Sequence, residues 1–290
     1  MEHHLTWTDH LIPNWELPGS YALISEDPGT DTAIVFFHGF LGDAHETWLN
    51  FQSMIDSQRS KNPEWDRSDL FFVQYSSFRK SISSIASIVL QVVDHLFPVP
   101  PPTLFEIDVM VEGVPENVIE MSLVKHEYKK LILVGHSEGG AALRRAVEVA
   151  YKDDTRVELR KKLAITELNL FAPAHLGFEP KGWLGACLSV SRIKAVAMTV
   201  LHLSRAFVEM EAKTTLINTL NNTNAYADEA PTFKALRARV LIGDDDDVVA
   251  HGEFKRDIVL DPPEPNQDHA SICKPRPGYP RPLPFAQGKE

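Results

Sequence analysis

Short, almost uninterrupted apolar runs alternate with segments of helical periodicity along most of the chain, and this alternation restricts the fold more than any other feature. Apolar runs at residues 32–38 (TAIVFFH), 131–134 (LILV) and 163–171 (LAITELNLF) are typical of strands buried on both faces of a parallel sheet. Apolar residues recur at helical spacing over 81–96 and 138–151. We therefore predict an α/β fold, with a mostly parallel central sheet flanked by helices.

Two segments and a tail interrupt this alternation. Residues 98–128 open with a proline-rich break and are interpreted as an insertion. A long helical and irregular segment covers 175–230. The tail, 274–290, contains five prolines and is predicted to be extended or mobile. We interpret residues 1–290 as a single α/β domain with two elaborations.

The charge balance limits the classes of partner. Lysine and arginine total 29 residues against 40 aspartate and glutamate residues, a formal net charge of −11. Nucleic-acid binding requires clustered basic residues, so we expect no nucleic-acid partner. The longest apolar-leaning stretch, 183–203, is interrupted by Arg192, Lys194 and His202, so we expect no integral membrane segment.

The cysteine content and the first residues of the sequence indicate the cellular compartment of the protein. The chain has only Cys187 and Cys273, which is typical of reduced thiols in a cytosolic protein, with one disulfide as the alternative. No basic segment followed by an apolar run opens the sequence, so we expect no signal peptide. We therefore predict a cytoplasmic protein.

The apolar run 131–134 leads directly into the hexapeptide GHSEGG at residues 135–140, where a helical pattern begins. Glycines two residues before and after a serine, at a tight strand-to-helix turn, allow close backbone packing and lift the serine hydroxyl above the sheet. The helix N-terminus there favours developing negative charge. The simpler interpretation is a glycine-rich turn in which Ser137 caps the helix. The strand and helix context favours Ser137 as a nucleophile.

This motif, with FHGFLG at residues 37–42 and the pair Thr47-Trp48, resembles the α/β-hydrolase superfamily, and within it lipase- and esterase-like serine hydrolases. The resemblance extends over about residues 32–269. It implies an α/β-hydrolase fold with a helical cap or lid after the sixth strand. The apolar-rich segment 175–230 fits that place, and an ordinary amphipathic helix packed on the core is the alternative.

A carbonyl attacked by Ser137 becomes a tetrahedral oxyanion, which two N–H donors must hold. In this superfamily one donor is the backbone N–H of the residue after the nucleophile, here Glu138. The resemblance assigns the second donor to Phe40, with Leu41 as the alternative. We interpret His38 as structural. The side chain of Glu138 either begins the helix with a favourable charge, which we favour, or faces the pocket rim.

A serine hydroxyl also needs a base, and the base needs an orienting carboxylate. In this superfamily the acid and then the histidine follow the serine along the chain. His269 resembles the late histidine of lipase-like relatives. His251 is the runner-up, and His175 and His202 are the other histidines in separate later segments.

The acid is expected in the turn GDDDDVV at residues 243–249, which follows an apolar run at 239–242. The relatives' pattern G-x-x-D-x-x-V places the acid at Asp246, with Asp247 as the nearest alternative. A solvated acidic turn or a cation site is the simpler interpretation. No comparable acid closely follows the run 163–171.

The sequence therefore predicts a serine hydrolase that cleaves carboxylic esters, lipid-like ones among them, through an acyl-enzyme on Ser137. We expect the triad Ser137, Asp246 and His269, with Phe40 and Glu138 as oxyanion donors. We expect no cofactor and no metal, and a small-molecule ester or lipid-like substrate as the partner. Two alternatives stay open. One is amide, thioester or lactone hydrolysis with the same triad, and the other is a non-catalytic binding or signalling protein on this fold.

Overall fold

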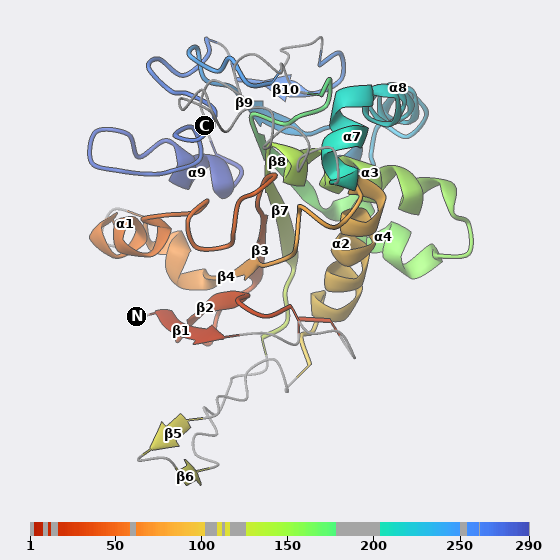
Figure 1. Ribbon diagram of the computed structural model, residues 1–290. Helices are drawn as coiled ribbons and strands as arrows, with labels where there is room; N and C mark the ends of the chain where they lie inside the picture. Colours follow the sequence, from red (N-terminus) through yellow and green to blue (C-terminus); the bar gives the residue numbers. More distant parts are fainter. Residues whose placement is uncertain are drawn as a thin grey trace.

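An eight-stranded sheet forms the centre of the computed structural model, in the strand order β1-β2-β4-β3-β7-β8-β9-β10 (Figure 1). The structure describes residues 3–7, 11–12, 17–58, 62–101, 109–111, 114–116, 126–177, 204–249, 254–260 and 262–289. The strands of this sheet are β1 His3–Trp7, β2 Tyr21–Ser25, β3 Thr32–Phe37, β4 Ser68–Val73, β7 Lys130–His136, β8 Glu167–Phe171, β9 Arg239–Leu241 and β10 Ile258–Val259. Strands β4, β3, β7, β8, β9 and β10 are parallel, and β2 is antiparallel to both of its neighbours.

Helices cover both faces of the sheet. They are α1 Phe51–Gln58, α2 Ile82–Leu96, α3 Glu138–Lys152, α4 Val157–Ile165, α7 Arg205–Ala212, α8 Thr214–Glu229 and α9 Pro282–Ala286, with 3₁₀ turns η1 Pro63–Arg67 and η3 Lys234–Leu236. Helices α1 and α9 lie on one face, and α2, α3, α4 and α8 lie on the other (Figure 1). The predicted α/β architecture is confirmed.

The central strands are buried on both faces, as their continuous apolar runs predict. In β3 every residue from Ala33 to Phe37 has no exposed surface, and Ile34 and Phe36 pair in register with Ile132 and Val134 of β7. Because the parallel strands share one direction, their carboxyl ends lie at one edge of the sheet. Ligand sites of open α/β sheets are expected at that edge.

The apolar run 163–171 is only partly a strand. Helix α4 continues to Ile165, and β8 begins at Glu167. Leu159 and Leu163, four residues apart on one side of the helix, are both buried. This helical burial overrides the strand pattern at the beginning of the run.

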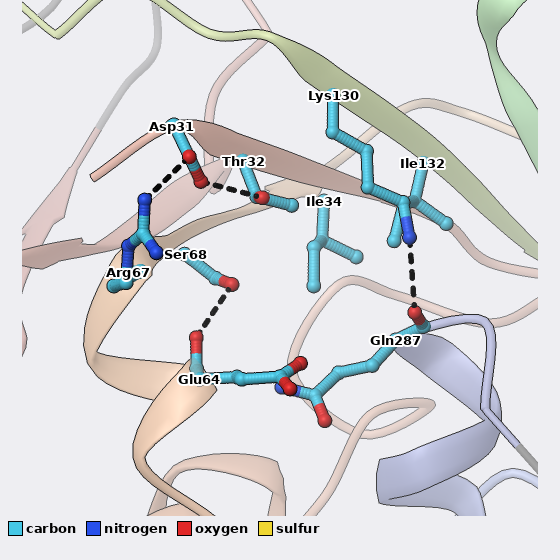
Figure 2. A pocket seen from close by; sticks show the side chains of 9 residues that line it. All are labelled: Asp31, Thr32, Ile34, Glu64, Arg67, Ser68, Lys130, Ile132 and Gln287. Carbon is cyan, nitrogen blue, oxygen red and sulfur yellow. Dashed lines mark hydrogen bonds and ion pairs between the residues drawn. The ribbon is translucent and has the colours of Figure 1, made fainter. Parts of the chain in front are cut away.

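The tail 274–290, predicted to be extended or mobile, is instead packed against the sheet as far as the structure describes it. Phe285 of α9 is fully buried, with its ring 4.7 Å from that of Phe171. Figure 2 shows Lys130 beside Gln287, whose carbonyl oxygen accepts a hydrogen bond from the lysine ammonium at 3.4 Å. The Arg239 guanidinium donates to the carbonyl oxygen of Lys289 at 2.8 Å. The proline count is misleading here because Pro282 begins a helix, where its missing N–H costs nothing.

The two predicted insertions are described in part. Within 98–128, β5 Val109–Val111 and β6 Val114–Glu116 form a separate antiparallel hairpin, drawn away from the main sheet in Figure 1. Within 175–230, residues 178–203 lie outside the described residues, including the apolar positions expected to line a lid. The remainder contains α7 and α8, and α8 packs on α3. Glu148 of α3 accepts hydrogen bonds from Thr219 at 2.7 Å and Asn222 at 2.6 Å.

A buried arginine joins α3 to three other parts of the chain. Arg144 donates to Asp257 at 2.6 Å, and the two side chains are 1% and 0% exposed. It also donates to Nε2 of His175, after β8, and to Thr223 of α8 at 3.4 Å. The second oxygen of Asp257 accepts from the backbone N–H of Ala238 at 2.9 Å. The network fixes α8 and the β9–β10 connection to the helix that follows Ser137.

We expect Asp257→Asn to destabilise the protein by about 3–5 kcal/mol, because it leaves the buried Arg144 charge without a carboxylate. Urea unfolding measures this loss. The matched control is Asp228→Asn, which breaks a pair with Arg256 in which both side chains are about half exposed (51% and 48%). The control should cost no more than about 1 kcal/mol. Equal losses in the two variants would show that the Arg144 network is not a major source of stability.

Candidate active site

Ser137 occupies a strained turn between β7 and α3. Its φ of 53° and ψ of −119° are rare for a residue with a side chain. Backbone hydrogen bonds hold it there, because its N–H donates to Phe171 at 3.0 Å and its carbonyl oxygen accepts from Ala174 at 3.1 Å. The hydrogen bond to the end of β8 therefore helps to hold Ser137 in its strained conformation. This conformation leaves the Ser137 hydroxyl at the carboxyl edge of the sheet.

Two glycines make this turn possible. A Cβ on Gly139 would overlap the backbone carbonyl groups of Phe37 and His38, and one on Gly135 would lie 2.8 Å from the Gly140 backbone. The first turn of α3 is thus pressed against the end of β3. This contact gives the spacing of the two glycines in GHSEGG a physical reason.

The structure brings together the three predicted triad side chains. His269 Nε2 lies 2.9 Å from Ser137 Oγ, and His269 Nδ1 lies 2.9 Å from Asp246 Oδ2. The Ser137 residue is 8% exposed, and the side chains of His269 and Asp246 are 13% and 0% exposed. The three residues come from β7–α3, from the turn after β9 and from a late loop, so they are far apart in sequence.

The charge of Asp246 decides the tautomer of His269. Burial acts to raise the pKa of Asp246, but the His269 interaction and the backbone N–H groups of Val248 and Val249 outweigh it and hold the pKa below its usual value. An ionised carboxylate accepts only, so the His269 proton lies on Nδ1. Nε2 then accepts from the Ser137 hydroxyl, which is the arrangement a general base requires.

The loops that carry the acid and the histidine are joined to each other. The backbone N–H of Asp244 donates to Glu264 at 3.0 Å, and that of Asp245 donates to Gln267 at 3.2 Å. Glu264 and Gln267 shortly precede His269 in the chain. The spacing between acid and base is therefore set by backbone hydrogen bonds as well as by the two side chains.

The described residues that were alternatives for the acid and the base lie outside the hydrogen-bonded triad. Asp247 is exposed at the pocket, and the carboxylate bonded to His269 is that of Asp246. His175 is bonded to Arg144; burial, and then the Arg144 charge, lower its pKa well below the usual value. His202 and His251 lie outside the described residues.

The two predicted oxyanion donors lie at the same edge. Glu138 is the first residue of α3, and its backbone N–H has no acceptor among the described residues, as expected for a helix N-terminus. Phe40 lines the same pocket as Ser137. The alternative donor, Leu41, uses its N–H in a 2.9 Å hydrogen bond to the Ser77 hydroxyl. The Leu41 N–H is thus already engaged, and Phe40 stays the predicted second donor.

Buried hydrogen bonds fix the loop that carries Phe40. The His38 ring stacks on Tyr75 at 4.0 Å, and the Tyr75 hydroxyl donates to the His38 carbonyl oxygen. Burial lowers the pKa of His38 to about 4, so the ring is neutral at neutral pH. Its Nδ1 lies 2.9 Å from the Gly39 carbonyl oxygen, and its Nε2 accepts from the Tyr75 N–H at 3.4 Å. These contacts assign a structural role to His38.

His136 is a site residue that the sequence reasoning missed. Its Nε2 donates to the backbone carbonyl oxygen of His269 at 2.7 Å, and the two rings are 4.8 Å apart. Burial lowers the pKa of His136 to about 3, so it supports the loop as a neutral donor. Its place directly before the serine was the available signal, but no local pattern shows that a residue 133 positions later lies beside it.

A pocket of about 360 Å³ opens over the Ser137 hydroxyl. Its apolar lining includes Phe40, Leu41 and Val248, and Leu41 is 53% exposed. The acids Glu46, Asp247 and Asp268 and the cation Lys274 also line it. The lining therefore combines apolar side chains with more acidic than basic ones.

The described residues outside the triad add no second kind of site. The described part of the chain contains no cluster of histidine, cysteine or acidic side chains arranged to hold a metal ion. None of the described helices is both long and apolar enough to cross a membrane. The Cys273 thiol is free, and burial raises its pKa to about 12. Cys187 lies outside the described residues.

Comparisons with solved structures identify the fold. The chain is similar to the mature form of a lipase of Bacillus licheniformis, BlEst2, with 15% identity over 87% of this chain and 91% of that one and a TM-score of 0.51. It is also similar to an esterase of Pyrococcus furiosus, with 13% identity over 91% and 82% of the chains and a TM-score of 0.49. No family model and no curated protein matches the chain significantly. The first similarity supports the predicted α/β-hydrolase fold, and at this identity it shows the fold alone.

We expect Gly139→Ala to destabilise the protein by about 1–3 kcal/mol, because its methyl group meets backbone carbonyl groups that cannot rotate away. Chemical unfolding measures the loss. Gly29→Ala is the control, since its methyl group would meet the movable carboxylate of Asp27. The control should change stability by less than about 0.5 kcal/mol. A neutral Gly139→Ala would contradict the tight packing of α3 on β3.

Proposed function

We propose that this protein is a serine hydrolase that cleaves carboxylic esters through an acyl-enzyme on Ser137. The observation that carries the proposal is the hydrogen-bonded chain from Ser137 through His269 to Asp246, of which Ser137 and His269 line a pocket. Such a chain converts a weakly nucleophilic hydroxyl into an effective nucleophile. The α/β-hydrolase fold adds support, since a lipase is among the proteins that share it.

The first half-reaction forms the acyl-enzyme. His269 Nε2 takes the hydroxyl proton as Ser137 Oγ bonds to the substrate carbonyl carbon. The carbonyl oxygen becomes an oxyanion held by the N–H groups of Glu138 and Phe40. His269 then gives its proton to the departing alkoxide, so that an alcohol leaves. Asp246 stabilises the imidazolium that exists between these transfers.

The second half-reaction returns the free enzyme. His269 removes a proton from water as the water oxygen attacks the acyl carbon. A second oxyanion forms between the same donors. It collapses by breaking the bond to Ser137 Oγ, which regains a proton from His269, and a carboxylic acid is released. The cycle needs no group beyond the protein and water.

The substrate class follows from the pocket. Its apolar residues at the mouth, Phe40 and Leu41, fit an acyl or alcohol chain, and its three carboxylates disfavour an anionic substrate. We propose neutral esters, lipid-like ones among them. Amides, thioesters and lactones place a similar carbonyl at Ser137, so a panel of matched substrates separates them. The cytoplasmic location stays a prediction.

Ser137→Ala is expected to lower hydrolysis of a short-chain p-nitrophenyl ester by at least about 10⁴-fold, because the bond-forming oxygen is removed. Labelling by a fluorophosphonate should disappear as well. The control is Ser53→Ala, an exposed serine on α1, which should retain both activities. Wild-type protein that neither hydrolyses esters nor takes the label would favour a non-catalytic binding protein instead.

Asp246→Asn is expected to lower kcat by about 10³- to 10⁴-fold, because the amide no longer holds His269 in the required tautomer. Asp247→Asn removes an equal charge from the same turn, but at an exposed position, and should change kcat by less than about threefold. Steady-state kinetics of both variants test the assignment. A large loss in Asp247→Asn alone would transfer the orienting role to Asp247.

A further inference from the structure

Glu138 carries a carboxyl group next to the nucleophile that the mechanism above does not use. The residue has no exposed surface, and neither carboxyl oxygen has a hydrogen-bond partner in the described structure. Glu138 is absent from the pocket lining, so its side chain is not at the rim. An isolated ionised carboxylate is very costly in such a place, whereas the neutral acid costs far less. Of the two sequence interpretations of this side chain, the position at the pocket rim is therefore wrong, and its burial without a partner disfavours a charge at the start of the helix.

The groups that act on this carboxyl are themselves acids. Burial raises the pKa of Glu138 well above its usual value, and repulsion from Glu209 of α7 raises it further. The other group coupled to it is Tyr75, whose pKa is raised by complete burial and then by Glu138. Among the described residues, no cation acts to offset these effects. The neighbouring His38 is neutral because of burial.

Glu138 lies near the start of the loop that follows β3 and carries Phe40. Its coupling partner Tyr75 stacks on His38 and donates to the His38 carbonyl oxygen. The next residue, Gly139, is pressed against that same carbonyl group. A charge on the Glu138 side chain would therefore act beside the loop that carries the Phe40 donor.

We propose that Glu138 works as an uncharged carboxylic acid, a positioning residue of the oxyanion site, and that loss of its proton switches the site off. The inference rests on the proposed function. At alkaline pH, hydroxide removes the carboxyl proton, giving water and a carboxylate, and acid restores the neutral form. The resulting charge opposes the negative charge that develops on the substrate oxygen, in surroundings that screen it little.

The pH dependence of kcat/KM for a neutral chromogenic ester, from about pH 5 to about pH 10, tests the inference. In wild type we expect a fall of about tenfold per pH unit on the alkaline side, as one deprotonation requires. Glu138→Gln cannot ionise, so this alkaline fall should be absent. Glu209→Gln removes the repulsion that favours the neutral acid, so the fall should move to lower pH.

Two controls separate this behaviour from general effects. Glu158→Gln changes a carboxylate on α4 whose side chain is 76% exposed, and it should leave the profile unchanged. Circular dichroism at each pH value excludes unfolding as the cause of the fall. An infrared difference spectrum of wild type against Glu138→Gln at neutral pH should contain the carbonyl band of a protonated carboxylic acid.

The outcomes also separate the two proposals. If wild type shows no Ser137-dependent hydrolysis at any pH, the proposed function fails. If hydrolysis occurs without an alkaline fall, or if Glu138→Gln retains the fall, the proposed role of Glu138 is wrong. If Glu138→Gln does not fold, the direction of the Glu209→Gln shift decides, and an unshifted profile overturns the inference. Absence of the carbonyl band of a protonated carboxylic acid in folded wild-type protein also overturns the inference.

Discussion

The contact between the start of α3 and the end of β3 is the constraint on which the site depends. Ser137 holds a positive φ because a glycine two residues later lets the helix lie against the carbonyl groups of Phe37 and His38. That same contact brings the loop after β3 beside the helix N-terminus. One packing interaction therefore positions the Ser137 hydroxyl and brings the backbone N–H of Glu138 near the loop that carries Phe40. Further along α3, the network around Arg144 fixes this helix to α8 and to the β9–β10 connection.

Two buried carboxyl groups near Ser137 have opposite surroundings. Asp246 is buried but receives three hydrogen bonds, which favour its charged form. Glu138 is buried without such bonds, which favours its neutral form. Environments that separate the proton affinities of two nearby acids are typical of catalytic sites. In the proposed mechanism, the Asp246 charge therefore lies beside the imidazole that becomes positive, and the neutral Glu138 adds no charge next to the oxyanion.

Features that depend on neighbouring residues were predictable from the sequence, and features that depend on distant contacts were less so. The strand–turn–helix around Ser137 is local, and its apolar run and glycines indicate it directly. Four adjacent aspartates look alike in the sequence, so Asp246 came from the family pattern, and only the fold shows which one bonds to His269. The support of His269 by His136 has no sequence signal. The tail was mispredicted because proline content reports backbone propensity, whereas the burial of Phe285 depends on Phe171, more than a hundred residues away.

The packing of α9 on Phe171 has a consequence for the order in which parts of the fold form during synthesis. A nascent chain can pair β3, β4, β7 and β8 long before Phe285 has been added. Until then, Phe171 lacks its contact with Phe285, and apolar surface that is exposed in folding intermediates is prone to aggregation. His269 also arrives late, after β10 and shortly before α9. Ser137 is therefore synthesised before His269, and His269 shortly before α9, which packs on Phe171.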